Sequence, residues 1–168
     1  MQMVNNILRI LQFLWTLLIT ALIGSAIASY DGASGQAKAS LNFAIFVAVL
    51  SWITLLYGLI AGFVTSVAIP IAVLVLDGLS VLFTFIAAVV LAAKLGAVNC
   101  SHIGDKGSNY IAYGTGNDQK QCRLIQASDV FFWFLFACYI ATMFFAFRAF
   151  RGAGGSVRSR PSMSQVGV

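Results

Sequence analysis

Glutamate is missing from this chain of 168 residues, and a single histidine, His102, supplies its only imidazole. One His, no Glu and three Cys cannot supply an H-E-x-x-H metalloprotease site, a pair of catalytic carboxylates or a zinc cluster. No nucleophile elbow or phosphate-binding loop occurs either. We therefore expect no enzymatic activity, no catalytic residue, no metal, no cofactor and no nucleic-acid partner.

Charge of either sign is also scarce. Only 9% of the residues are charged, whereas a soluble domain carries roughly 25%. A helix needs about 20 apolar residues to cross the ~30 Å core of a bilayer. The sequence therefore predicts an all-α integral membrane protein, a bundle of four transmembrane helices. The stretches without Lys, Arg, Asp or Glu are Ile10–Tyr30, Ala39–Leu76, Gly78–Ala93 and Val130–Phe147.

The chain divides into a membrane domain, residues 1–147, and a tail. Residues 94–129 form the only long polar connection between predicted spans, and Pro70 suits the first turn of the third span because its missing N–H would have no helical partner. Residues 148–168 contain Arg, Ser and Gly but no acid. Such a segment buries too little apolar surface to fold, so we predict a disordered basic tail. The predicted spans are about 10–29, 41–63, 70–93 and 130–147.

An even number of spans places both ends of the chain on one side of the membrane. The positive-inside rule does not decide which side this is, because each side has five positive residues when Arg9 is counted as the flank of the first span. A disulfide between Cys100 and Cys122, which persists in oxidising compartments, would put their loop outside and both termini in the cytoplasm. The alternative is two unpaired loop thiols. The two positive groups are Arg9, Arg148, Arg151, Arg158 and Arg160 against Lys38, Lys94, Lys106, Lys120 and Arg123.

Asp77 is an ionisable residue inside the predicted membrane domain. Such a group costs at least ~2.5 kcal/mol at the centre of a span and usually faces the bundle interior with a partner. Seven residues beyond Pro70, it lies about 10 Å from the helix end. Its role is a proton-linked or ligand-linked switch, or a neutral carboxylic acid whose hydrogen bonds fix the packing. The polar cluster predicted at this level is Asp77, Tyr57, Ser80, Thr84, Thr16 and Thr142.

Two further patterns concern packing and lipid. Gly58 and Gly62 form a G-x-x-x-G, which allows close helix packing within the bundle or between two copies of the chain. The fourth span is dense in aromatic rings, for which we predict lipid contact and a preference for ordered lipids or sterols. The predicted lipid-contacting rings are Phe131, Phe132, Trp133, Phe136, Phe144 and Phe145.

The tail carries four arginines that can bind an anionic leaflet, an attraction that phosphorylation of nearby serines would weaken. The alternative is a tail that serves only to orient the protein. The residues of this predicted switch are Arg148, Arg151, Arg158, Arg160, Ser156, Ser159 and Ser162.

Several short strings occur in an order and spacing that resemble a known family. They are NILR at Asn6–Arg9, LYGLIAGF at Leu56–Phe63, LDGLSVLFTF at Leu76–Phe85, GTG followed by QCRLIQA at Gln121–Ala127, and a final SQVGV. The chain resembles the MARVEL-domain tetraspan proteins and, more narrowly, the fungal non-classical export protein family associated with eisosomes. The resemblance implies a four-helix plasma-membrane protein with cytoplasmic termini, no enzymatic activity, and a role in organising membrane microdomains and responding to sphingolipid state.

The sequence thus predicts a membrane organiser whose partners are membrane lipids, with sphingolipid, sterol and anionic lipid as candidates. Copies of the same chain and eisosome-type membrane proteins are the candidate protein partners. The rival hypothesis is a small proton- or ion-coupled transporter or channel that uses Asp77. A transport pathway should line several spans with polar groups from one face to the other, and the outer half of these spans has almost none.

Overall fold

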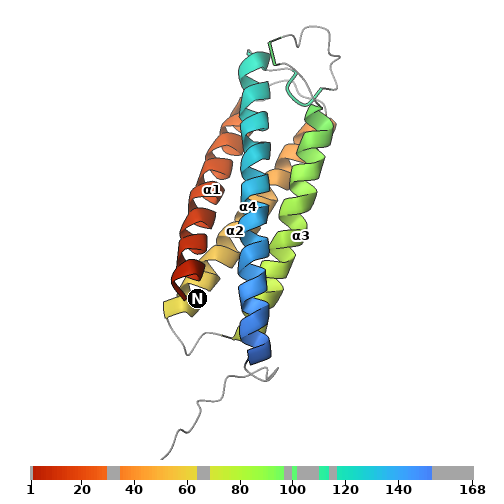
Figure 1. The fold of residues 1–168 in the computed structure, drawn as a ribbon. Helices are drawn as coiled ribbons and strands as arrows, with labels where there is room; N and C mark the ends of the chain where they lie inside the picture. The colour runs from red at the N-terminus through yellow and green to blue at the C-terminus, as the bar shows by residue number, and fades with distance from the viewer. Residues whose placement is uncertain are drawn as a thin grey trace, which may run out of the picture.

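The structure, a computed structural model, describes residues 2–29, 35–63, 69–96, 100–101, 110–113 and 117–152. Four long helices account for most of this part of the chain, and it contains no strand. The predicted all-α fold with four helices is confirmed (Figure 1). The helices are α1 (Gln2–Ala28), α2 (Gly35–Phe63), α3 (Pro70–Leu95) and α4 (Asp118–Gly152).

Each helix contains a stretch that is long and apolar enough to cross a membrane. The four helices have 27, 29, 26 and 35 residues, all above the roughly 20 that a bilayer core requires. Lipid cannot hydrogen-bond the backbone, so an apolar stretch that enters it satisfies its N–H and C=O groups within a helix. The scarcity of charge therefore determines the secondary structure directly.

Two helices extend beyond the predicted spans. α1 begins at Gln2 rather than near residue 10, which places Arg9 about two turns inside the helix. α4 covers Asp118–Gly152, so the polar connection is helical from residue 118, and Arg148 and Arg151 belong to a helix rather than to a disordered tail. Arginine is a good helix former and is favoured near a helix C-terminus, so α4 continues where the apolar stretch ends.

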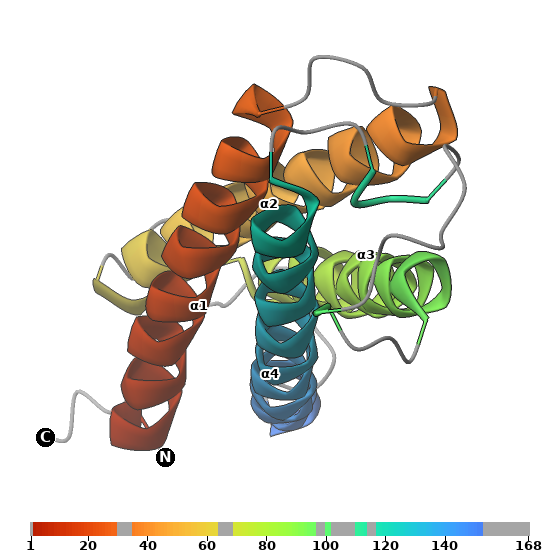
Figure 2. The ribbon, with the colours of Figure 1, turned by 90° about the horizontal axis from the view of Figure 1, so that it is seen from above.

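The four helices form a closed ring. Each helix contacts the next along the chain, and α4 returns to contact α1. Figure 2, viewed along the bundle, shows α4 between α1 and α3, with α2 on the opposite side. Among the described helices, α1 and α3 lie across the ring from each other without close backbone contact, as do α2 and α4. A contact between diagonal helices must therefore be made by long side chains.

The two ends of the bundle differ in character. The first residues of α1 and the last turns of α4 lie at one end (Figure 1), here called the terminal end. At the other end Cys100 and Cys122 form a disulfide that closes a separation of 22 residues. Burial raises the pKa of the Tyr110 hydroxyl, which stays protonated and donates a hydrogen bond of 3.0 Å to the Leu95 carbonyl. Tyr110 is thus joined to the last turn of α3 at this disulfide end.

The apolar core lies mainly in the half of the bundle nearer the disulfide. Alanines on α2 and α3 face the interior there, and their small side chains let helices approach closely in a membrane. Isoleucines of α1 and larger side chains of α4 fill the remaining space. The core of this half includes Ile19, Ile23, Ala44, Val47, Ala48, Ala87, Ala88, Leu91, Ile125, Phe132 and Leu135.

Candidate functional site

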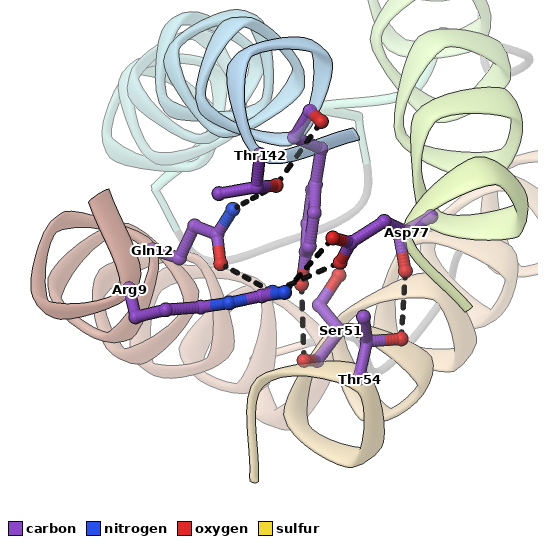
Figure 3. A network of polar contacts seen from close by, with 8 residues as sticks. Arg9, Gln12, Ser51, Thr54, Asp77 and Thr142 are labelled. Carbon is purple, nitrogen blue, oxygen red and sulfur yellow. Dashed lines mark hydrogen bonds and ion pairs between the residues drawn. The ribbon is translucent and has the colours of Figure 1, made fainter. Parts of the chain in front are cut away.

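A buried ion pair joins two diagonal helices near the terminal end. Nη1 of Arg9 on α1 donates to Oδ1 of Asp77 on α3 at 2.9 Å, and its Nη2 donates to Oδ2 at 2.8 Å. The two side chains are 3% and 0% exposed. Two parallel charge-assisted hydrogen bonds fix the orientation of both groups as well as their distance. Figure 3 shows the pair at the centre of the four helices.

The sequence analysis did not place Arg9 in this site, nor Gln12, Ser51, Thr54 and Tyr139. Counted as a cationic flank of the first span, Arg9 is instead the partner that Asp77 requires. α1 and α3 run in the same direction because α2 returns the chain between them, and each residue is seven positions from the start of its helix. The equal depth of Arg9 and Asp77 could have revealed the pair from the sequence, but only if α1 had been predicted to start at Gln2.

The partner also changes the interpretation of Asp77. Arginine keeps its charge inside proteins, and both carboxyl oxygens of Asp77 accept N–H groups from Arg9. This is the pattern of an ionised carboxylate. The neutral carboxylic acid considered from the sequence does not fit the geometry.

Gln12, one turn beyond Arg9, extends the network to α4. Its Oε1 accepts a hydrogen bond of 3.0 Å from Nη1 of Arg9, and its Nε2 donates to Oγ1 of Thr142 at 3.1 Å. The Thr142 hydroxyl donates in turn to the carbonyl of Tyr139 at 3.1 Å. Gln12 is fully buried, and these contacts orient its amide.

The second diagonal of the ring is also joined by a side chain. The Tyr139 hydroxyl on α4 donates to the Ser51 carbonyl on α2 at 3.1 Å. Thr54 on α2 and Ser80 on α3 share a hydrogen bond of 2.8 Å between their hydroxyls. All four helices are thus connected through one layer, in which Arg9–Asp77 and Tyr139–Ser51 link the two diagonal pairs (Figure 3). We call the set Arg9, Gln12, Ser51, Thr54, Asp77, Ser80, Tyr139 and Thr142 the polar layer.

Gly58 makes room for the arginine. A Cβ at this position would lie 2.6 Å from Cζ of Arg9 and 2.8 Å from its Nε. The guanidinium therefore lies directly against the backbone of α2. At Gly62 the nearest neighbour of such a Cβ is Oδ1 of Asn6, at 4.0 Å. Both glycines of the G-x-x-x-G thus face α1 of the same chain.

The other residues of the predicted cluster have different environments. Ser80 and Thr142 belong to the polar layer, and Thr84 is buried with its hydroxyl donating to the Ser80 carbonyl at 2.6 Å. Thr16 is buried, but its Oγ1 has no hydrogen-bond partner among the described residues. Tyr57 is half-buried, next to Gly58 on α2.

The aromatic rings of α4 divide between the interior and the outer surface. Phe132 is 0% exposed and lies in the core, so the prediction that it contacts lipid is wrong. It lies three residues before Leu135 and seven before Tyr139, a spacing that places all three on one inward face. Trp133 and Phe144 are exposed, whereas Phe131, Phe136 and Phe145 are partly buried.

Rings also cover the contacts between neighbouring helices. Trp15 of α1 stacks on Phe131 and Phe134 of α4 at centroid distances of 5.4 and 5.3 Å. Phe85 of α3 packs edge-on against Trp133 of α4 at 6.0 Å. Aromatic pairs also join α1 to α2 and α2 to α3. These pairs are Phe13 with Trp52, and Phe83 with Phe43 and Phe46.

The last turns of α4 combine rings with the described arginines of the predicted switch. Cζ of Arg148 lies 5.7 Å from the centre of the Phe144 ring, and Cζ of Arg151 lies 5.7 Å from that of Phe147. Both arginines are exposed. The other residues of that switch, Arg158, Arg160, Ser156, Ser159 and Ser162, lie outside the described residues.

Comparison with known proteins identifies the family. Residues 2–145 match the model of the MARVEL domain, described as a membrane-associating domain. The chain belongs to the MARVEL family. This confirms the family that the sequence strings indicated, and the chain is a multi-pass membrane protein of four spans.

Two yeast proteins show the narrower likeness of this MARVEL chain, and both are from Saccharomyces cerevisiae (strain ATCC 204508 / S288c). Non-classical export protein 2 is 32% identical, over 98% of this chain and 94% of the relative. Non-classical export protein 2 homolog 1 is 30% identical, over the same shares. No solved structure matches the chain.

Proposed function

We propose that this MARVEL protein is a non-enzymatic organiser of the plasma membrane, which helps to form or maintain lipid microdomains and responds to sphingolipid state. The observation that carries the proposal is the contrast between its interior and its surface. Inside, the two fully buried charged side chains of the described residues, Arg9 and Asp77, are paired with each other. Outside, every pair of neighbouring helices presents aromatic rings toward the lipid side. Such a molecule can act through the lipids and copies of itself that it gathers.

The packing argues against the rival transporter. A proton or ion pathway needs polar groups that follow one another from face to face. Between the polar layer and the disulfide end, Ile19, Ile23, Val47, Leu91 and Leu135 are fully buried. The buried Gln121 and Ser128 of this half donate to backbone carbonyls. Asp77 is held by two hydrogen bonds from Arg9, so its charge serves to link α1 to α3 across the ring.

The names of the two yeast relatives refer to non-classical export. A bundle with a filled interior would support such a process through the membrane around it rather than through a channel of its own. Localisation at the plasma membrane, with both termini cytoplasmic, belongs to the same proposal.

Reconstitution in giant vesicles that separate into ordered and disordered lipid phases tests the function. Labelled protein should collect with the ordered, sphingolipid- and sterol-rich phase. Replacing the exposed rings Trp133 and Phe134 by Leu should reduce this enrichment, because rigid ring surface is lost while apolar character is kept. The matched control replaces Leu79 and Leu82, exposed aliphatic residues on α3, by Ile and should keep it, because no ring is lost.

The same vesicles, loaded with a pH-sensitive dye, test the rival. If the protein is an organiser, vesicles that contain it should show the same proton flux as protein-free vesicles. A flux that requires the wild-type protein and disappears in a folded Asp77→Asn variant would establish the transporter in its place.

A further inference from the structure

The last turns of α4 carry a second polar feature, separate from the polar layer. Phe144, Phe147, Arg148 and Arg151 line a shallow hollow on the surface of the bundle. Their positions i, i+3, i+4 and i+7 put all four on one face of the helix. The two rings are 55% and 46% exposed, so none of the other three described helices covers this face.

The order of these residues along α4 matches the layers of a membrane surface. The rings come first in the direction in which α4 leaves the apolar stretch, and the arginines follow one turn later. Phenylalanine rings are wholly apolar and lie on the hydrocarbon side of the boundary between acyl chains and headgroups. Guanidinium groups one turn further out, about 5 Å along the axis, reach the depth of lipid phosphates.

The charge of the hollow has no counter-ion within the described protein. The ion pair described there is Arg9–Asp77, and neither Arg148 nor Arg151 takes part in a salt bridge. Each guanidinium instead lies over a ring face at 5.7 Å, which holds it in place without neutralising it. A planar guanidinium offers paired N–H donors that fit the oxygens of a phosphate.

From this geometry we infer that the hollow formed by Phe144, Phe147, Arg148 and Arg151 binds the headgroup of an anionic phospholipid in the leaflet at the terminal end. The phosphate lies between the two guanidiniums, and the first part of an acyl chain lies against the rings. This inference rests on the proposed function, since both make lipid the partner, and it adds a defined site and a lipid class.

The opposite end of α4 provides a matched control. Lys120 and Arg123 line a second hollow there with Asn117, Gln119, Leu124 and Ala127. This hollow has the same number of cations but no aromatic ring, and the acid Asp118 lies close in sequence. In a nanodisc with the same lipids in both leaflets, the two ends meet identical headgroups. A difference between them then reflects the site and not the leaflet.

The test uses the full chain in phosphatidylcholine nanodiscs that contain phosphatidylserine with a photoactivatable group, and measures lipid crosslinked to each peptide. Crosslinks should concentrate on the peptide that contains Phe144–Arg151. Arg148→Gln with Arg151→Gln should raise the apparent Kd for phosphatidylserine about 30-fold, roughly fivefold for each arginine near the surface. Lys120→Gln with Arg123→Gln should change it far less.

Three companion measurements separate a binding defect from a folding defect. Arg148→Lys with Arg151→Lys keeps the charge but loses the paired N–H donors, and should restore only part of the binding. Thermal unfolding of all variants should stay close to wild type, since the four side chains lie on the surface. Inorganic phosphate added to discs of phosphatidylcholine alone should not protect the arginines from chemical modification, because the site needs the lipid.

Equal crosslinking at both ends, or an unchanged Kd in the Arg148→Gln, Arg151→Gln variant, would overturn the inference and leave the hollow to an acidic protein segment. The proposed function is judged separately, by enrichment in the ordered phase. A wild-type protein that collects there without any preference for phosphatidylserine would overturn the headgroup site and leave the organiser standing.

Discussion

At the scale of single residues, the membrane domain depends on how Arg9 and Asp77 are paired. A charge in the middle of a bilayer is costly, and removing one partner of a buried pair leaves the other charge uncompensated. The pair lies in the polar layer, where Arg9 also donates a hydrogen bond to Gln12. Its stabilising effect is therefore a property of the two residues together, not of either one.

Comparing two single variants with an apolar double variant measures this coupling. Asp77→Asn and Arg9→Gln should each lower the free energy of unfolding by about 3–5 kcal/mol, because each leaves a buried charge without its counter-charge. Arg9→Met with Asp77→Leu should recover most of the loss, since an apolar pair of similar volume needs no counter-charge. Unfolding in lipid nanodiscs is the measurement, with the exposed Arg123→Gln as the control. An Asp77→Asn variant as stable as wild type would contradict the ion pair.

At the scale of helices, the contact between α1 and α2 is set by a missing side chain. The Cζ atom of the Arg9 guanidinium lies 2.6 Å from the place that a Cβ at position 58 would occupy, which is too close for any residue other than glycine. The guanidinium cannot move aside freely because Asp77 holds both of its Nη atoms. A feature of α2 thereby fixes how α1 meets α3 across the ring.

Adding one methyl group tests this dependence. Gly58→Ala should destabilise the bundle by about 1–3 kcal/mol, the usual effect of overpacking. Gly62→Ala, with 4.0 Å to its nearest neighbour, and Gly24→Ala, with nothing within 4 Å, should have little effect or stabilise slightly through helix propensity. Thermal unfolding of the three variants provides the comparison. In an Arg9→Met background the penalty at position 58 should shrink, and an undiminished penalty would show that the arginine is not its cause.

At the scale of the whole molecule, the disulfide indicates which end of the bundle faces the outside of the cell. Arg9 is buried against Asp77 and no longer represents a positive flank, so the positive-inside count leaves four residues at the terminal end against five at the other. The described cysteine pair, Cys100–Cys122, is the stronger indication, because such a bond persists outside the cytosol. We therefore keep the proposal that the disulfide end faces outward.

Thiol labelling in intact cells checks this orientation. With Cys138 replaced by Ala, a membrane-impermeant thiol reagent should label the chain only after an impermeant reductant has opened the Cys100–Cys122 bond. Labelling without reductant would show that the bond is absent in the cell. Labelling that requires permeabilisation of the membrane would place the disulfide end in the cytoplasm and reverse the proposed topology.

The sequence by itself determined the class of protein and its four helices. This was possible because a bilayer imposes one rule on every apolar stretch: backbone groups that lipid cannot satisfy must bond within a helix. That rule acts locally, so it can be read without knowing which helices touch. The presence of Asp77 in an apolar stretch likewise predicted a polar site in the interior.

Only the tertiary structure decided which residues meet. In a membrane the outside of a helix is as apolar as the inside, so the composition of α4 could not show that Phe132 faces the core while Trp133 faces outward. The partner of Asp77 lies 68 residues away, on a helix whose start was placed too late. Pairing across the ring depends on the depth and rotation of each helix, and these are set by packing rather than by any local pattern.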